Sequence, residues 1–364
     1  MEFLYETIAA VTWQQVIMWC LGALLIFLAI KKDMEPALLL PMGFGAILIN
    51  IPFSGAEGVM SSLFAIGIEM NEIMPLVLFI GIGAMIDFGP LLSNPKLFLF
   101  GGAAQFGIFL TILLAAACGF SIEDAASIGI IGAADGPTSI VVAQTLKSNY
   151  VGPIMVVAYS YMALVPIIQP AVIKLTTTKK ERLIRMEYKP ASVSKRTKIL
   201  FPILVTIVSG LIAPASLSLV GMLMFGNLIR ECGVLNYLTD TAKDVLTNLV
   251  TLFLGITIAF TMKAENFITV QTLMIMGLGL CAFIFDTFSG VMLAKVMKLF
   301  LQEKINPMIG AAGISAFPMS ARIVQKMGIK EDPTNHLLMH AVGANVSGQI
   351  ASAIVGGLII GLVL

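Results

Sequence analysis

Charged residues are scarce in this chain: they make up 12% of its 364 residues, while hydrophobic residues make up 58%. The mean hydropathy is +0.97. A soluble domain of this length carries far more charge on its surface, so the composition excludes that class and indicates a polytopic membrane protein. Strand signals are absent as well, and we therefore predict an all-α fold.

Metal-binding and nucleotide-binding patterns are also missing. The four cysteines include no CxxC pair, which favours buried structural thiols over a redox or metal site. His336 and His340 are four residues apart but have no glutamate between them, so they do not predict a metal site other than for sodium. Without a Walker loop or any nucleic-acid motif, the chain is expected neither to pump by ATP hydrolysis nor to bind nucleic acid.

No lysine or arginine precedes the first apolar run, from Val16 to Ile30, whereas Lys31 and Lys32 follow it. This order of charge is the reverse of a cleaved signal peptide. Segment 1–34 is therefore predicted to be an N-terminal transmembrane helix.

The positive charges are concentrated in one segment. Nine of the 22 lysines and arginines lie between Lys174 and Lys198, with only Glu181 and Glu187 against them. The positive-inside rule places this basic loop, residues 176–198, in the cytoplasm. Two roles remain open for it: a linker that fixes the topology, or a surface on which a soluble partner docks.

The most informative stretch runs from Gly132 to Ser139 and places Asp135 among glycine and proline, inside an apolar run from 128 to 142. A carboxylate at membrane depth is costly and is usually retained for ion or proton handling. Glycine and proline predict an interrupted helix whose freed backbone groups can bind an ion. The alternative is a simple helix cap. We prefer a cation ligand that can carry a proton instead.

An internal repeat supports this hypothesis. Residues 78–82 resemble residues 252–256, which lie 174 positions later. We predict a duplicated unit, with repeat 1 at 35–175 and repeat 2 within 199–364, and interrupted helices at 128–145 and 305–327 that face each other near the membrane midplane. The two halves are expected to be inverted relative to each other. A second set of matches, 181 positions apart, pairs Gly129, Gly132, Pro137, Ser139 and Gln144 with Gly310, Gly313, Pro318, Ser320 and Gln325.

Only one of the two breaks carries a carboxylate, and one negative charge among hydroxyls and carbonyls suits a sodium ion. Thr138 and Ser139 are either ligands or hydroxyls bonded back to helix carbonyls. Asn345 and Ser347 lie in a glycine-bounded polar notch, which serves either helix packing or ion binding.

Four further side chains lie in or beside apolar segments, and two of them keep two interpretations. Asp87 is best explained as a helix end, whereas Asp286 either ends a helix or lines a cavity. Tyr161 is by default an interfacial aromatic residue. Arg322, about one turn after Pro318, either extends its charge to the cytoplasm or receives an anion.

Four stretches together resemble the β-subunit of the sodium-translocating biotin-dependent decarboxylases, which serve oxaloacetate, methylmalonyl-CoA, glutaconyl-CoA and malonate decarboxylases. The resemblance covers nearly the whole chain, and its longest block is specific. The stretches are 132–138, 159–162, 306–322 and 340–348.

This resemblance implies a multi-pass subunit of a bacterial or archaeal inner membrane. Such a subunit decarboxylates carboxybiotin held by a partner and couples this to Na⁺ export against H⁺ uptake. The implied partners are soluble carboxyltransferase and biotin carrier subunits and a small membrane anchor subunit, within an assembly that contains several copies of the chain. Sodium and the partner's carboxybiotin are the implied cofactors.

The resemblance also implies residue roles. Asp135 is the essential carboxylate, Tyr161 serves proton transfer and Arg322 lies near carboxybiotin. The resemblance places Asp135, Asn306, Ser315 and Asn345 in the sodium-binding region and Gly310 in its support. From the residue patterns we add Thr138 and Ser347 to the expected sodium-binding residues, and Gly136, Pro137 and Pro318 to the supporting ones.

The main rival is a stand-alone Na⁺-coupled transporter of an organic anion, since repeats, broken helices and one acid fit it equally well. A purely structural membrane anchor is a third alternative. The sequence does not identify the acid that the complex decarboxylates, because that chemistry lies on another chain.

Overall fold

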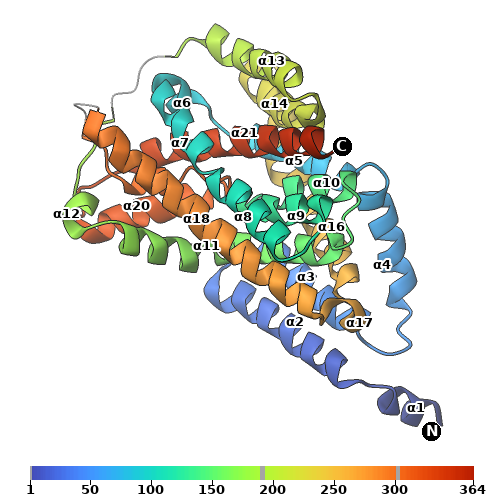
Figure 1. Cartoon of the computed structure of the whole chain (residues 1–364). Helices are drawn as coiled ribbons and strands as arrows, with labels where there is room; N and C mark the ends of the chain where they lie inside the picture. Colours follow the sequence, from blue (N-terminus) through green and yellow to red (C-terminus); the bar gives the residue numbers. More distant parts are fainter. Residues whose placement is uncertain (1, 189–192, 301–303) are drawn as a thin grey trace.

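The computed structural model describes residues 2–188, 193–300 and 304–364, and Figure 1 shows the arrangement of their helices. Within these ranges the regular structure is entirely helical, as the sequence predicts. The first half contains α1 (Glu2–Ala9), α2 (Trp13–Lys32), α3 (Pro36–Ile49), α4 (Ala56–Phe64), η1 (Ala65–Glu69), α5 (Ile73–Met85), α6 (Gly89–Ser93), η2 (Pro95–Leu97), α7 (Phe98–Ala103), α8 (Phe106–Ala117), α9 (Ile122–Gly129), η3 (Ile130–Ala133), α10 (Gly136–Thr145), α11 (Val151–Thr176) and α12 (Lys179–Arg182). The second half contains α13 (Lys195–Ile212), η4 (Pro214–Ser216), α14 (Leu217–Cys232), α15 (Asn236–Asp240), η5 (Thr241–Leu246), α16 (Thr247–Ala259), η6 (Phe260–Met262), α17 (Ala264–Phe267), α18 (Val270–Phe300), α19 (Met308–Ala311), α20 (Met319–Glu331) and α21 (Leu338–Val363).

The described part of the chain has six helical runs that are long and apolar enough to cross a membrane. A seventh candidate is a bent pair, 56–69 with 73–85, whose two halves meet at 63°. The multi-pass prediction is therefore confirmed by length and composition. The six runs are Trp13–Lys32, Pro95–Ala117, Val151–Thr176, Asn236–Met262, Val270–Phe300 and Leu338–Val363.

The N-terminal span begins and ends as its sequence dictates. Thr12 caps α2 by accepting a hydrogen bond from the Gln15 N–H, and the Gln15 side chain accepts one from the Thr12 N–H. Lys31 and Lys32 occupy the last turn, where positive charge complements the helix dipole. Helix α2 runs along the edge of the molecule, and α1 projects beyond it (Figure 1).

One sequence-based alternative is wrong: Asp286 does not end a helix, because it lies within the single helix α18, which has 31 residues. Part of the polar run around it is bonded inside the protein. One oxygen of the Asp286 carboxylate accepts a hydrogen bond from the Gly107 N–H, and the Ser289 hydroxyl donates to the Asp286 carbonyl. Polar groups that are bonded in this way do not end a helix.

Three long helices enclose the centre of the molecule. Helix α18 packs against η3 and α19, α11 packs against α10 and α20, and α21 packs against α10 and α20. The two interrupted segments, at 130–135 and 312–318, therefore lie inside a cage of α11, α18 and α21. A π-helical turn occurs in the bent pair (η1), and another occurs in the run Asn236–Met262 (η5). The duplication of the two halves and their inversion stay predictions.

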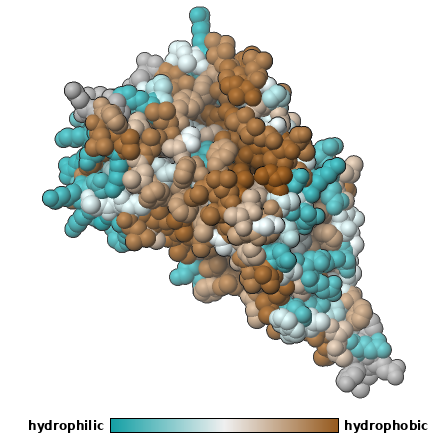
Figure 2. All heavy atoms as spheres, viewed as in Figure 1, coloured by the Kyte–Doolittle hydropathy of each residue, from teal (hydrophilic) through white to brown (hydrophobic). Residues whose placement is uncertain are grey.

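Hydrophilic side chains gather at opposite ends of the molecule. In Figure 2 they lie along the left edge, beside α12 and α20, and at the lower right, beside α4 and α17, with a hydrophobic face between them. The left end includes the beginning of the basic loop. Three ion pairs tie this loop to the helices: Arg182–Glu331 at 2.7 Å, Arg185–Asp332 at 2.6 Å and Lys295–Glu181 at 3.3 Å.

Candidate functional site

The first break sets Asp135 between two helices. Helix α9 tightens into the 3₁₀ segment η3, Ala134 takes a left-handed conformation at φ 54°, and Asp135 is extended at φ −132°. Helix α10 then begins at Gly136, with Pro137 in its first turn, where a missing N–H costs nothing. Asp135 holds the N-cap position but makes no side-chain capping bond to α10. Its carboxylate is therefore available to other groups.

That carboxylate is buried and takes its hydrogen bonds from side chains. Asp135 is 3% exposed, and its Oδ2 accepts from Thr138 Oγ1 at 2.6 Å, from Gln349 Nε2 at 3.1 Å and from Ser352 Oγ at 3.2 Å. Gln349 and Ser352 lie one turn apart on α21. Donors aimed at one oxygen favour its charged form in an apolar interior.

The second break is bonded directly to the first. Ser315 lies between α19 and α20, and both its N–H and its hydroxyl donate to the Ala133 carbonyl, at 3.2 and 2.7 Å. Asn345 on α21 donates from Nδ2 to the Ile314 carbonyl at 2.7 Å, while its buried Oδ1 has no hydrogen-bond partner among the described residues. Ser315 and Asn345 therefore hold the two breaks and α21 together and leave one amide oxygen free.

Ser139 is bonded back to a backbone carbonyl, which was the alternative to a ligand role. Its hydroxyl donates to the Asp135 carbonyl at 2.9 Å. Ser347 faces α7: its hydroxyl donates to the Leu97 carbonyl at 2.9 Å and accepts from the Gly101 N–H at 3.0 Å. These contacts do not bring Ser347 to the Asp135 carboxylate.

Two glycines allow the close approaches that shape the site. A Cβ on Gly136 would lie 2.3 Å from the Tyr159 ring, and one on Gly310 would lie 2.0 Å from the Gly290 carbonyl oxygen. Real Cβ atoms do not approach this closely, so a side chain at either position would push neighbouring segments apart. Pro318 directly precedes α20 and ends the second break.

Two tyrosines of α11 have different surroundings. The Tyr161 hydroxyl donates to the Met276 carbonyl on α18, so Tyr161 joins two helices. Tyr159 is buried against Gly136 in the first break, and its hydroxyl has no hydrogen-bond partner in the described ranges. The structure thus places Tyr159, which the sequence did not single out as a candidate, against Gly136, the residue that follows Asp135.

Asn306 and Arg322 lie toward the end that carries the basic loop. Asn306 Nδ2 donates to the Arg182 and Ile184 carbonyls at 3.0 and 2.8 Å, and its Oδ1 accepts from the Met308 N–H at 3.0 Å. Arg322 is exposed on α20, and its charge acts on Glu35 in the turn between α2 and α3. Neither side chain is hydrogen-bonded to the Asp135 group of residues.

Sequence reasoning missed Gln349 and Ser352. Their signal is a spacing: positions 345, 349 and 352 share one face of a helix, and all three are polar inside an apolar segment. The oxygens near Asp135 are one carboxylate and several neutral hydroxyl and amide groups. Such a set suits one monovalent cation. Within the described ranges, no three His, Cys, Asp or Glu side chains cluster as a transition-metal site would require.

A multi-pass helical protein with a buried carboxylate between two bonded helix breaks belongs to the class of ion-translocating membrane proteins. Comparison with known proteins narrows this class. Residues 14–363 match the family described as Na⁺-transporting oxaloacetate decarboxylase beta subunit. The chain belongs to this family of decarboxylase β-subunits, as the resemblance in its sequence predicted.

Three relatives illustrate the range of the family. The chain is 50% identical to the methylmalonyl-CoA decarboxylase subunit beta of Propionigenium modestum, over 95% of this chain and 94% of the relative. It is 48% identical to the glutaconyl-CoA decarboxylase subunit beta of Acidaminococcus fermentans, over 97% and 94%. It is 43% identical to the oxaloacetate decarboxylase beta chain of Klebsiella pneumoniae, over 96% and 95%.

Family membership settles the main functional alternative. The chain is a membrane β-subunit of a Na⁺-transporting decarboxylase, and the stand-alone transporter is not supported. As a β-subunit it is one part of a complex of several subunits.

Proposed function

We propose that this chain decarboxylates carboxybiotin presented by a partner subunit and couples the reaction to Na⁺ export against H⁺ uptake, with Asp135 as the exchanging group. One observation carries the proposal. The Asp135 carboxylate is buried between two helix breaks, and these breaks are joined through Ser315 and Ala133. A group bound at Asp135 is therefore sensed by both halves of the chain.

The exchange follows from competition for one carboxylate. A sodium ion and a proton cannot occupy the same lone pair, so each excludes the other from Asp135. Thr138, Ser352 and the free Asn345 amide oxygen supply neutral oxygens for the ion. When the proton replaces the ion, the three side chains that donate to Oδ2 must rearrange. This rearrangement can bias a movement of one group of helices against the other.

Carboxybiotin supplies the driving reaction: its bond between ring nitrogen and carboxylate breaks, CO₂ leaves and a proton ends on the nitrogen. We propose Tyr161 as a proton-transfer residue and Arg322 as a residue near the incoming carboxylate. For Asn306 and Ser347, the contacts support a positioning role rather than direct ligation. The Asn306 amide is bonded to backbone groups of the basic loop, and the Ser347 hydroxyl is bonded to backbone groups of η2 and α7.

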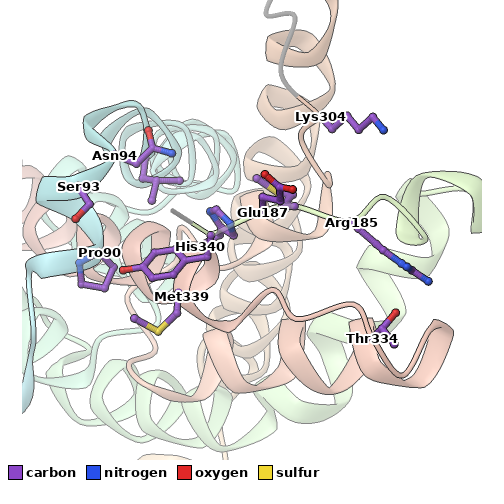
Figure 3. A pocket seen from close by; sticks show the side chains of 12 residues that line it. Pro90, Ser93, Asn94, Arg185, Glu187, Lys304, Thr334, Met339 and His340 are labelled. Atoms are coloured by element: carbon purple, nitrogen blue, oxygen red, sulfur yellow. The ribbon is translucent and has the colours of Figure 1, made fainter. Parts of the chain in front are cut away.

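A cavity of about 850 Å³ is a candidate entrance for the partner's biotin. It lies beside the basic loop, and Arg185, Lys304 and His340 are on its wall (Figure 3). His340 is 7% exposed and packs edge-on against Tyr188, with ring centroids 5.7 Å apart. Glu187 lines the cavity as well, so the lining is mixed in charge, and its cationic and aromatic groups suit an anionic ring system.

The surrounding assembly follows from the same proposal. The positive-inside rule places the basic loop and this cavity on the cytoplasmic side of a bacterial or archaeal inner membrane. There the loop meets the soluble carboxyltransferase and biotin carrier subunits. A small membrane anchor subunit and further copies of the chain complete the complex.

Replacement of Asp135 by asparagine tests the proposal. In the intact complex, reconstituted in vesicles, D135N should abolish both radioactive Na⁺ uptake and Na⁺-dependent CO₂ release. Asparagine keeps the shape of the side chain but carries no charge and cannot bind a transferable proton. Coupled transport by D135N at the wild-type rate would refute the role of this carboxylate.

A further inference from the structure

The beginning of the basic loop is bonded to the second half of the chain at one backbone group. The Arg182 carbonyl oxygen accepts a hydrogen bond from Asn306 Nδ2 and another from Asn335 Nδ2, both at 3.0 Å. Asn306 begins the segment that leads into the second break, and Asn335 lies in the turn between α20 and α21. One carbonyl of the loop is therefore held from both sides of the second break.

Asn306 makes further bonds to the same stretch of the loop. Its Nδ2 also donates to the Ile184 carbonyl at 2.8 Å, and its backbone N–H donates to Met186 Sδ at 3.2 Å. Its Oδ1 accepts from the Met308 N–H at the start of α19. Asn306 thus fixes loop residues 182–186 directly to the helix that precedes the second break.

The same stretch of the loop continues into a wall of the cavity proposed for the partner's biotin. Residues 185–188 line this cavity, and the His340 ring on α21 packs edge-on against Tyr188 (Figure 3). The bonded stretch and the cavity wall overlap in sequence. A ligand that moves the wall therefore also moves groups that are bonded to Asn306.

Asn335 is a buried amide with only half of its polar groups bonded. It is 1% exposed, its Nδ2 donates to the Arg182 carbonyl, and its Oδ1 has no hydrogen-bond partner within the described ranges. An unpaired buried oxygen is costly, and a leucine of similar size would avoid that cost. Stability alone is thus a poor explanation for an amide at this position. The bond to Arg182 is the contribution that a leucine could not make.

Both side chains that hold the loop are connected to the Asp135 site. Asn306 leads through α19 to Ser315, which bonds to the first break. Asn335 directly precedes α21, whose Gln349 donates to the Asp135 carboxylate. The cavity wall is therefore linked to Asp135 by two routes, one through each side of the second break.

We propose that Asn335 is a positioning residue that joins the biotin cavity to the second break through the Arg182 carbonyl. The proposal rests on the proposed function and deepens it. Carboxybiotin in the cavity moves the loop wall, and the shared carbonyl passes this movement to Asn306 and to the start of α21. Without the bond from Asn335 the wall moves more independently, and CO₂ is then released without the movement that exports Na⁺.

The test is the number of Na⁺ ions exported per CO₂ released by the intact complex in sealed vesicles. Asn335→Leu keeps the approximate size of the side chain and removes the donor. We expect N335L to lower this ratio about twofold or more, since loss of one hydrogen bond shifts an equilibrium about two- to tenfold. A merely structural defect would lower Na⁺ export and CO₂ release in proportion and leave the ratio unchanged.

Asn50→Leu is the matched control. Asn50 is also buried, and its Nδ2 donates to the backbone carbonyls of Ala46 and Met262, so that it joins α3 to η6. It also bonds to the first residue of α17, away from the basic loop (Figure 1). N50L should lower the unfolding temperature and leave the ratio of Na⁺ to CO₂ at the wild-type value.

If N335L does not assemble, Glu331→Gln takes its place. The Glu331 carboxylate pairs with Arg182 Nε at 2.7 Å, and loss of this pair loosens the same loop residue from the end of α20. E331Q should lower the ratio in the same direction as N335L.

A wild-type ratio in the assembled variant, or an equal fall of the ratio in N50L, would overturn the role of Asn335. If D135N has meanwhile lost Na⁺ export, the proposed function stands and only this role fails. Export of Na⁺ by D135N at the wild-type rate would instead overturn the proposed function itself. The two failures are therefore distinguishable.

Discussion

Ser315 donates both its N–H and its hydroxyl to the carbonyl oxygen of Ala133, at 3.2 and 2.7 Å. These bonds join the second break to the first, two residues before Asp135. Two segments that lie 182 residues apart in the chain thus share one carbonyl group. Through this contact, a structural change at the Asp135 site can alter the position of the second break.

Ser315→Ala removes the hydroxyl bond and leaves the N–H bond. A buried hydrogen bond contributes about 0.5–1.5 kcal/mol, so we expect the half-saturating Na⁺ concentration for CO₂ release to rise about three- to tenfold. Ser139→Ala is the control, because its hydroxyl only returns to the Asp135 carbonyl within the same helix. An equal effect of S139A would contradict a special role of the link between the breaks.

Ser352→Ala removes one of the three donors to Asp135 Oδ2. A hydrogen bond to a charged group contributes about 1.5–3 kcal/mol, and we expect at least a roughly tenfold rise in the half-saturating Na⁺ concentration. The measurement is Na⁺ uptake by reconstituted vesicles over a range of external concentrations. Ser62→Ala on α4, where the hydroxyl bonds only to its own helix, should behave as wild type.

Gly310→Ala should separate α19 from α18, because the new Cβ would lie 2.0 Å from the Gly290 carbonyl oxygen. Overpacking of this kind typically costs about 1–3 kcal/mol, and the unfolding temperature in detergent should fall accordingly. Gly102→Ala meets no atom within 4 Å and serves as the matched control. Equal unfolding temperatures for the two variants would refute the close backbone contact.

The two tyrosines of α11 should respond differently to removal of their hydroxyl groups. Tyr161→Phe loses the bond to the Met276 carbonyl and should lose about 1 kcal/mol of stability. Tyr159→Phe removes a hydroxyl with no partner, so its unfolding temperature should not fall. If Tyr161 transfers a proton, Y161F should also lose turnover beyond what its fraction of folded protein explains. Turnover and unfolding are therefore measured on the same preparations.

The Arg185–Asp332 pair should not contribute to the pH dependence of stability near neutrality. The Thr334 N–H, together with Arg185 and the Thr334 hydroxyl, lowers the pKa of Asp332 from 3.8 to about 2. A lowered folded-state pKa gives stability that is complete above the unfolded value and is lost as the pH falls toward 2. The difference in unfolding temperature between wild type and D332N should be constant from pH 5 to 8 and shrink below pH 4. A change within the upper range would contradict the assignment.

The sequence predicts the first break well, because charge, glycine and proline rarely occur together in an apolar run. It predicts the partners of Asp135 poorly. Gln349 and Ser352 come from a helix that is distant in sequence, and only packing brings them to the carboxylate. The tyrosines show the same limit. Residues two apart on a helix point in nearly opposite directions, so the choice between Tyr159 and Tyr161 depends on how α11 is rotated.

The helix-end alternative for Asp286 fails for a physical reason of the same kind. A polar run inside an apolar segment predicts a turn only if its groups need water. Here the Gly107 N–H, from a distant part of the chain, donates to one oxygen of Asp286, and the Ser289 hydroxyl donates to a carbonyl of α18. The bond from Gly107 is tertiary and cannot be read from a local pattern, and with it the helix continues through Asp286.

That continuity has a mechanical consequence. At 1.5 Å per residue, the 31 residues of α18 extend about 46 Å, well beyond the ~30 Å hydrocarbon core of a bilayer. One stretch of this rod touches the Asp135 break, and farther along it Lys295 pairs with Glu181 of the basic loop. A soluble subunit that moves the loop would therefore shift α18 as one rigid helix, and the movement would reach the first break inside the membrane.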